Sequence, residues 1–413
     1  MKINKYISAI CALVALSSFS AMAQDALSPY SRFGYGTLRD NATSSQRAMG
    51  GVGYAMQSGR QINVMNPAAY AAMDSLTFLF DMGVTLSHMS AKDAGNKASD
   101  WGGGLDYITF QFPIMKNMGA SVGMVPVTST GYAFGEEISN GSSAYQGSGG
   151  INLIYAGLGY RPFKGFSLGA NVGYMFGNTT NDNYVYTSTG SMSLFQRVME
   201  VRDYSLQFGV QYVVPLSRHN RMTFGVSYTP GKGLRGKTYG VMYDQNDATE
   251  PDTTQVMHLN GNYSMPDTWG AGVNLALRNR WMVEADFTYQ PWKNAKYATL
   301  DGFEGTRFDN RWKVAMGVQY TPNPRGSWIQ RVNYRMGAYY DRDYIMIGDN
   351  HLRKEGVTLG FGLPAPNSKT VINLSMEYYR RKATPNPLVK ENYFNITLGV
   401  NFNELWFWQS KIR

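Results

Sequence analysis

The sequence predicts an all-β protein, a transmembrane antiparallel β-barrel of about 14 strands that holds an N-terminal hatch segment. Three observations predict this fold. The chain begins with an export signal, no later segment is apolar enough to cross a membrane as a helix, and apolar and polar residues alternate strictly in one segment after another. A strand with one apolar and one polar face produces this period of two.

The export signal occupies residues 1–23. Lys2 and Lys5 precede an apolar stretch, and small residues follow it as at a cleavage site, so we expect the mature chain to begin at Gln24. An uncleaved anchor is the alternative, but the stretch is much shorter than the roughly 20 apolar residues of a spanning helix. Cys11, the only cysteine, lies in this signal, which leaves the mature chain without disulfides or thiolate metal sites.

Composition argues against several classes of function. The formal charge of +9 falls to +7 when the two signal lysines are removed, and it shows no basic cluster, so we expect no nucleic-acid partner. The four histidines have no metal-ligand spacing, and no nucleophile or phosphate-loop motif is present. We therefore expect no catalytic residue, no metal and no cofactor. The alternative is a barrel enzyme that assembles a His beside a Ser or Asp at one rim.

Alternation is clearest in the last strand, where Phe394, Ile396, Leu398, Val400 and Phe402 share one face and polar residues or glycine share the other. A soluble β-sandwich would also alternate, but its strands are usually about 5 or 6 residues long. Many segments here are long enough for the roughly 9 to 11 residues of a tilted membrane strand. The expected strands lie near 76–90, 104–115, 118–134, 150–162, 165–178, 203–214, 221–243, 267–278, 281–291, 311–321, 331–342, 354–363, 370–381 and 392–403. Two strands are the alternative for 221–243, and 254–264 is assigned to a loop.

The connections between these strands are of two kinds. Short turns, such as the one at 279–280, are expected to alternate with long polar loops at 179–202, 244–266 and 292–310. This asymmetry, together with aromatic residues at many strand ends, is typical of barrels in the bacterial outer membrane. We therefore expect residues 76–403 to form the barrel, in contact with outer-membrane lipid in a diderm bacterium, and 404–413 to form an aromatic and basic tail.

The segment 24–75 is neither strand-like nor of low complexity. It contains RAMGGVGYA from Arg47 and NPAAYAAMDS from Asn66. A barrel of about 14 strands is too wide for its own side chains to fill. We therefore interpret this segment as a hatch inside the barrel, with Asn66, Pro67 and Ala68 as its motif.

These motifs, in this order before a first strand, resemble the FadL family of outer-membrane transport proteins (OMPP1/FadL/TodX). The similarity continues through MPDTWGAGVNLAL, RWMVEADFTYQPW, RWKVAMGVQYTP and the Arg335–Gly337 spacing, so it covers nearly the whole mature chain. The resemblance implies a hatch, a 14-stranded barrel and passive uptake of hydrophobic small molecules such as long-chain fatty acids, released sideways into the membrane.

Sideways release requires an interruption of the barrel wall. In the expected strand 118–134, Pro126 lacks a donor for the ladder and Gly123 relaxes the backbone, so strand pairing is expected to fail or bulge there. Members of the family place a kink in this strand. The alternative interpretation is a proline that only marks a strand end.

Five charged residues fall on the polar, inward-facing phase of their strands: Glu284, Asp286, Lys313, Arg335 and Glu377. One interpretation is a network of ion pairs that holds the hatch. The other is a site in which Lys313 or Arg335 binds an anionic head group. An alternative to uptake is a FadL-like barrel that serves as a structural partner in a secretion or outer-membrane assembly complex, with other outer-membrane or extracellular proteins as its partners.

Overall fold

The computed structural model describes residues 28–74, 76–93, 95–188, 192–244, 252–300, 305–366 and 369–405. The expected signal at 1–23 lies outside the described residues, as does most of the tail from Trp406 onward. Glu404 and Leu405, which were assigned to the tail, belong to the last strand instead.

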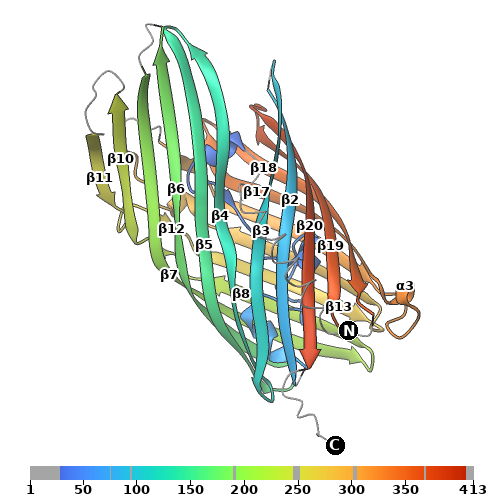
Figure 1. The fold of residues 1–413 in the computed structure, drawn as a ribbon. Coiled ribbons are helices and arrows are strands. Elements are labelled where there is room, and N and C mark those ends of the chain that lie inside the picture. Colours follow the sequence, from blue (N-terminus) through green and yellow to red (C-terminus); the bar gives the residue numbers. More distant parts are fainter. Residues whose placement is uncertain are drawn as a thin grey trace, which may run out of the picture.

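A closed antiparallel barrel forms the body of the molecule (Figure 1). Neighbouring strands pair in chain order, and the last strand pairs with the first along its whole length, from Thr77 opposite Leu405 to Lys92 opposite Lys390. The prediction of about 14 strands is confirmed. The 14 wall strands are β2 (Thr77–Lys92), β3 (Lys97–Met115), β4 (Met118–Ile138), β5 (Gly141–Phe163), β6 (Phe166–Thr187), β7 (Met192–Ser217), β8 (Asn220–Thr229), β13 (Thr268–Leu277), β14 (Trp281–Gln290), β16 (Arg311–Tyr320), β17 (Asn333–Ile347), β18 (Asn350–Pro364), β19 (Val371–Thr384) and β20 (Lys390–Leu405).

Short elements lie within the N-terminal segment and the connections between wall strands. The N-terminal segment carries the 3-10 helices η2 (Pro29–Arg32) and η3 (Pro67–Ala72), the strand β1 (Thr37–Leu38) and the helix α2 (Ser44–Arg47). The connections carry β9 (Lys232–Gly233), β10 (Gly236–Asp244), β11 (Asp252–His258), β12 (Ser264–Met265), η4 (Trp292–Asn294), β15 (Arg307–Phe308) and α3 (Trp328–Arg331). No helix in the described ranges is both long and apolar enough to span a bilayer.

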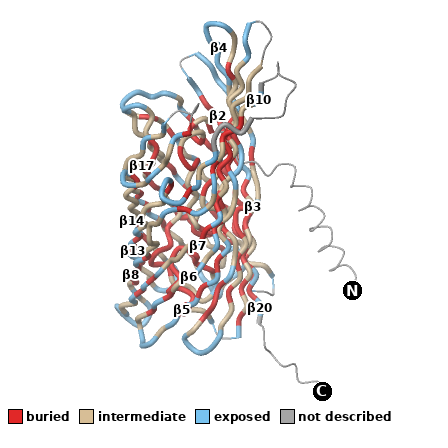
Figure 2. Tube along the Cα trace, turned by 90° about the vertical axis from the view of Figure 1, so that its left-hand side faces the viewer, coloured by how far each residue is buried: buried red, intermediate tan, exposed pale blue. Residues whose placement is uncertain are grey.

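The outer surface of the wall is apolar. Val172, Leu398 and Val357 are between 50 and 59% exposed, although each stands in the middle of a strand that is paired on both sides. Charged and amide side chains occupy the inner face, and buried residues follow the interior of the barrel (Figure 2). Such a band of exposed apolar side chains is stable against lipid and not against water.

Two predicted features of the connections were wrong. Most of 179–202 is strand, because β6 continues to Thr187 and β7 starts at Met192. The predicted loop 244–266 contains β11 and β12. The segment 221–243, for which two strands were the alternative, forms β8 and β10. Strict alternation of apolar and polar residues is absent from 179–202. Polar residues occupy most positions of β6 there, and the buried apolar residues Val198, Met199 and Val201 of β7 do not follow a period of two.

We expect the outward face of β6 to distinguish lipid from water. Val172→Arg places a charge in the apolar band and should reduce the free energy of folding into vesicles by about 2–4 kcal/mol. Thr180→Arg lies on the same face beyond the aromatic Tyr174 and is the matched control. Equal losses of folding free energy in the two variants would contradict the proposed position of the membrane.

Candidate functional site

The Asn66–Ala68 motif turns the N-terminal segment against the barrel wall. The Asn66 side chain accepts a hydrogen bond from the backbone N–H of Ala68 at 3.1 Å and donates one to the carbonyl of Tyr54 at 2.7 Å. Pro67 then starts η3, where its fixed φ suits a first helical position. The motif therefore has a structural role at this turn.

A row of glycines on the inner wall receives this turn. Gly159, Gly169 and Gly209 lie opposite one another on β5, β6 and β7. A Cβ at Gly169 would lie 2.4 Å from the carbonyl group of Pro67, and one at Gly209 would lie 2.1 Å from the Asn66 side chain. The close approach of the segment to the wall thus requires residues without a side chain.

Ion pairs fix the same segment to the opposite wall. Asp40 accepts from the Lys313 ammonium at 2.6 Å and from Arg311 at 3.2 Å, while Arg311 also binds Asp341 at 2.7 Å. Burial favours the neutral form of Asp40, but the two cations outweigh burial and hold the pKa of Asp40 well below its usual range.

Carboxylates on β14 bind the backbone of the segment. Asp286 accepts from the N–H groups of Gly53 and Tyr54 at 2.6 and 3.0 Å, and Glu284 accepts from the N–H of Ala55 at 2.9 Å. Of the five inward charges, Glu284 and Asp286 thus bind the backbone of the N-terminal segment and Lys313 binds its Asp40, whereas Glu377 binds Tyr339 and Asn395 of the wall.

Arg335 and Lys313 do not form a common site. Arg335 is 2% exposed and donates to Gln319 and Asn373, each at 2.7 Å. Along the β16–β17 ladder, Lys313 pairs opposite Asp341 and Gln319 opposite Arg335. The two cations are therefore six residues apart along the wall, or about 20 Å. A single anionic head group cannot contact both.

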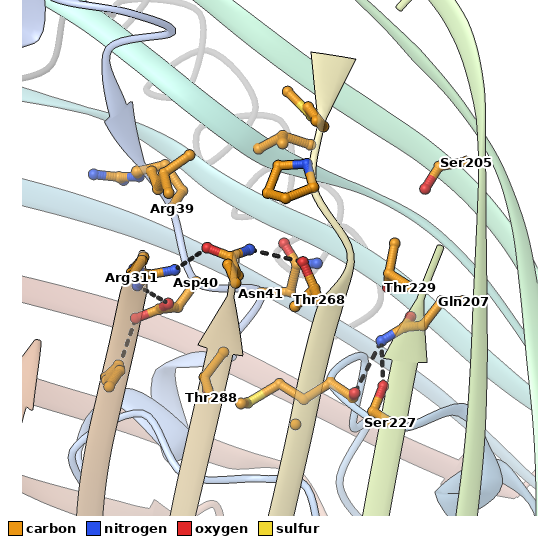
Figure 3. Close-up of a pocket in the computed structure, with 18 of the residues that line it drawn as sticks. Arg39, Asp40, Asn41, Ser205, Gln207, Ser227, Thr229, Thr268, Thr288 and Arg311 are labelled. Atoms are coloured by element: carbon orange, nitrogen blue, oxygen red, sulfur yellow. Dashed lines mark hydrogen bonds and ion pairs between the residues drawn. The ribbon is translucent and has the colours of Figure 1, made fainter. Parts of the chain in front are cut away.

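A cavity of about 180 Å³ lies between the N-terminal segment and the walls β7, β8, β13, β14 and β16 (Figure 3). Apolar residues, among them Leu38, Val127 and Met175, line it together with Asp40, Arg311 and Lys313. Gln207 lies across the cavity from Asp40 and Arg311 (Figure 3), and its side chain donates to the carbonyl of Met65 at 2.9 Å. Arg335 does not line this cavity.

The wall beside this cavity is interrupted between β3 and β4, and we call this interruption the seam. From the turn at Met115–Met118, pairing proceeds as far as Ile108 opposite Met124 and then stops, and the two strands diverge (Figure 1). The stop falls between Gly123 and Pro126, the two positions singled out from the sequence. A register shift follows in the β4–β5 ladder between Pro126 and Thr128.

The N-terminal segment bridges the seam. On one side β1 pairs with β4, with Leu38 opposite Thr128, and the backbone N–H of Arg39 donates to the carbonyl of Val127 at 2.9 Å. On the other side the Arg39 guanidinium donates to Asp106 of β3 at 2.9 Å. A single residue thus binds both strands that have separated.

Asp106 reaches the lumen through a β-bulge. In the β2–β3 ladder, Gly83 lies opposite Tyr107 and Val84 opposite Leu105, so Asp106 has no partner and turns inward. It is 2% exposed and accepts from Arg47 at 3.0 Å as well as from Arg39.

The whole chain also matches a family model. The model described as BamG matches residues 3–413. This chain belongs to the BamG family. No curated protein matches its sequence. The FadL-like fold predicted from the sequence is confirmed, and with it a location in the outer membrane of a Gram-negative bacterium.

Solved structures similar to this BamG-family protein are FadL-type barrels. A Pseudomonas aeruginosa FadL homologue has a TM-score of 0.64 and 12% identity, covering 89% of this chain and 99% of that one. The Pseudomonas putida toluene transporter TodX has a TM-score of 0.61 and 15% identity, covering 90% of this chain and 100% of that one. The Ralstonia pickettii toluene transporter TbuX has a TM-score of 0.55 and 12% identity, covering 88% and 98%.

A packed aromatic cluster joins the N-terminal segment of this BamG-family protein to the connection after β14 and to β17. Tyr35 of the N-terminal segment is fully buried, and its ring lies 5.7 Å from that of Trp292 and 5.2 Å from that of Tyr297. The Tyr344 hydroxyl donates to the carbonyl of Gly36 at 2.6 Å. The N-terminal segment therefore contacts the connections between strands as well as the barrel wall.

Sequence reasoning missed Asp106, Arg39 and Tyr35. A signal for Asp106 was present, because the outward apolar positions step by two up to Leu105 and then by three to Ile108. This phase slip is the mark of a bulge. Arg39 and Tyr35 had no such signal, since their partners lie far away in the sequence.

We expect Gly169→Ala to loosen the seat of the N-terminal segment. The added Cβ overlaps the carbonyl group of Pro67 and should reduce the free energy of unfolding by about 1–3 kcal/mol. Gly233→Ala, whose Cβ would meet nothing closer than 3.9 Å, is the control. Thermal unfolding in detergent measures both variants, and equal midpoints would contradict the close contact at Gly169.

The pKa of Asp40 predicts a pH dependence. A carboxylate with a lowered pKa in the folded state contributes stability above its unfolded pKa of about 3.9, and this contribution is lost as pH falls below that value. The difference in melting temperature between the wild type and Asp40→Asn should therefore be largest at pH 5–7 and should shrink below about pH 4. A difference that grows on acidification would contradict the ion pairs.

Proposed function

We propose that this protein admits small hydrophobic molecules from the cell surface and releases them sideways into the outer membrane through the seam, without catalysing a reaction. The observation that carries the proposal is the end of β3–β4 pairing at Met124, beside a cavity with apolar walls at Leu38 and Val127. An apolar solute that leaves through the wall enters lipid without returning to water. The similar structures named as toluene transporters support the same class of solute.

The size of the cavity favours small solutes. At about 180 Å³ it is close to the roughly 150 Å³ cavity that accepts benzene. Drug-sized ligands usually occupy about 300 Å³ or more. A monoaromatic molecule therefore fits the cavity as it stands, whereas a long-chain fatty acid requires the N-terminal segment to move.

The Arg39–Asp106 contact should control passage through the seam. Asp106→Asn removes a buried charge-assisted pair, and such a bond contributes about 1.5–3 kcal/mol, so uptake should rise about tenfold. Radiolabelled toluene and oleate, offered to cells that lack other uptake barrels, provide the measurement. Toluene uptake should exceed that of oleate in the wild type.

Asp309→Asn is the control. Asp309 also forms an ion pair, with Arg342 at 2.7 Å, but neither residue lines the cavity or contacts the seam. Its uptake should remain within about twofold of the wild type, because no seam contact changes. If neither variant changes uptake, or both raise it equally, passage through the seam is contradicted.

A second candidate function is that of a structural partner in a secretion or outer-membrane assembly complex. Two observations favour it: Tyr35 packs into a buried cluster with Trp292 and Tyr344, and ion pairs at Asp40 hold the same N-terminal segment. A barrel whose N-terminal segment is held in place by such contacts is consistent with a structural role. Stoichiometric co-purification of another membrane protein, with no uptake by the wild type or by Asp106→Asn, would favour this function over transport.

A further inference from the structure

Within the described residues, the seam leaves one edge of β3 without a strand beside it. Residues Lys97–Tyr107 pair with β2 on one side. On the other side, pairing with β4 covers only Ile108–Met115, and the described part of the chain provides no other backbone hydrogen bond to the edge from Trp101 to Asp106. This edge presents a row of backbone donors and acceptors at the opening.

The free edge lies at the depth of the apolar band. Leu105 is opposite Val84 of β2, and Val84 is opposite Leu398 of β20, so Leu105 and Leu398 hold equivalent ladder positions two strands apart. They are 46 and 50% exposed on the outward face, and Trp101 is 58% exposed. Hydrocarbon cannot hydrogen-bond a peptide group, and each unsatisfied group at this depth costs several kcal/mol.

The barrel cannot satisfy this edge by closing on itself while the N-terminal segment is in place. Continuing the register would set Leu105 opposite Val127 and Asp106 opposite Pro126. Pro126 has no N–H to donate, and the carbonyl of Val127 already accepts from Arg39. The next residue, Thr128, is paired with Leu38. The edge of β4 is thus hydrogen-bonded to the N-terminal segment. Among the described residues, the edge of β3 has no such partner.

We propose that the edge of β3 from Trp101 to Asp106 is a docking site for an extended segment of another polypeptide, which adds to the barrel as a strand. A polypeptide strand supplies the alternating donors and acceptors that lipids and apolar solutes lack. Gly102, Gly103 and Gly104 carry no side chains that would hinder its approach. The neighbouring strand β4 provides a precedent, since it has already accepted β1 as an added strand.

The chemistry of the seam specifies the docked segment. Its outward side chains must be apolar, because they would continue the lipid-facing surface at Trp101 and Leu105. Its inward side chains must be polar, because they would face the charges of Asp106 and Arg39. The edge offers Trp101–Asp106, so the segment needs about six residues in extended form, close to the usual length of a strand.

A second copy of this chain does not meet these requirements. Antiparallel pairing of β3 with β3 would turn one barrel upside down relative to the other in the membrane. Parallel pairing about a two-fold axis along the strands would set identical groups of the two edges opposite each other, donor against donor. A second copy is thus excluded, and the occupant that we propose is a different polypeptide.

Photo-crosslinking tests this docking site. A benzophenone amino acid replaces Leu105 or, as the matched control at the equivalent ladder position of a fully paired strand, Leu398 in the mature protein in lipid nanodiscs. The probe is a synthetic eight-residue peptide of alternating valine and threonine, and its control is the same peptide with alternate amides N-methylated. The adduct with the probe should form about tenfold more at position 105 than at 398, and N-methylation should abolish the excess.

Equal yields at the two positions, or an excess that survives N-methylation, would show that the peptide only partitions into lipid and would overturn the proposal. Amide hydrogen exchange on the unsubstituted protein provides an independent measurement. The probe should slow exchange over 101–106 about tenfold and leave 395–400 unchanged. If 101–106 already exchanges as slowly as 395–400 without the probe, the edge is not free and the proposal fails. Neither readout involves solute uptake, so the outcome is separate from that of the transport proposal.

Discussion

The constraint on which the rest of the structure depends is that every backbone N–H and C=O in hydrocarbon needs a partner. The ladder from β2 around to β20 meets this constraint at nearly every position of the wall, and the long pairing of Thr77–Lys92 with Lys390–Leu405 closes it. The seam is the exception. There the edge of β4 is satisfied by β1 and Arg39, while the edge of β3 remains available. Both proposed activities follow from this one departure, because an incomplete ladder is where a solute can leave and where a strand can be added.

The N-terminal segment connects the seam to the rest of the barrel. Its Asn66–Ala68 turn rests on a row of glycines, its Asp40 is held between Arg311 and Lys313, and its Arg39 binds both β4 and β3. A displacement of the segment at one of these points would therefore also change the contacts at the others. This arrangement explains how a segment with few regular elements is fixed inside the barrel. It also means that the contacts across the seam depend on the position of the N-terminal segment.

Much of this structure could be predicted from the sequence, because lipid on one side and a polar lumen on the other impose a period of two. The strand of Phe394–Phe402, the inward charges Glu284 and Lys313, and the interruption at Gly123–Pro126 all express that pattern or its local failure. The hairpin at 179–202 was missed because its apolar and polar residues do not alternate: Val198 and Met199 are adjacent in the sequence and both are buried. Arg39 and Tyr35 were missed because their partners, Asp106 and Trp292, become neighbours only when the barrel closes around the segment.

The most direct test of the central claim is a density map of the full-length protein in lipid nanodiscs, examined at the wall beside Gly123–Pro126. The account predicts that β3–β4 pairing ends at Ile108 opposite Met124 and that β1 lies along β4 above this point. Continuous pairing that brings Leu105 opposite Val127, with the N-terminal segment away from the wall, would contradict it.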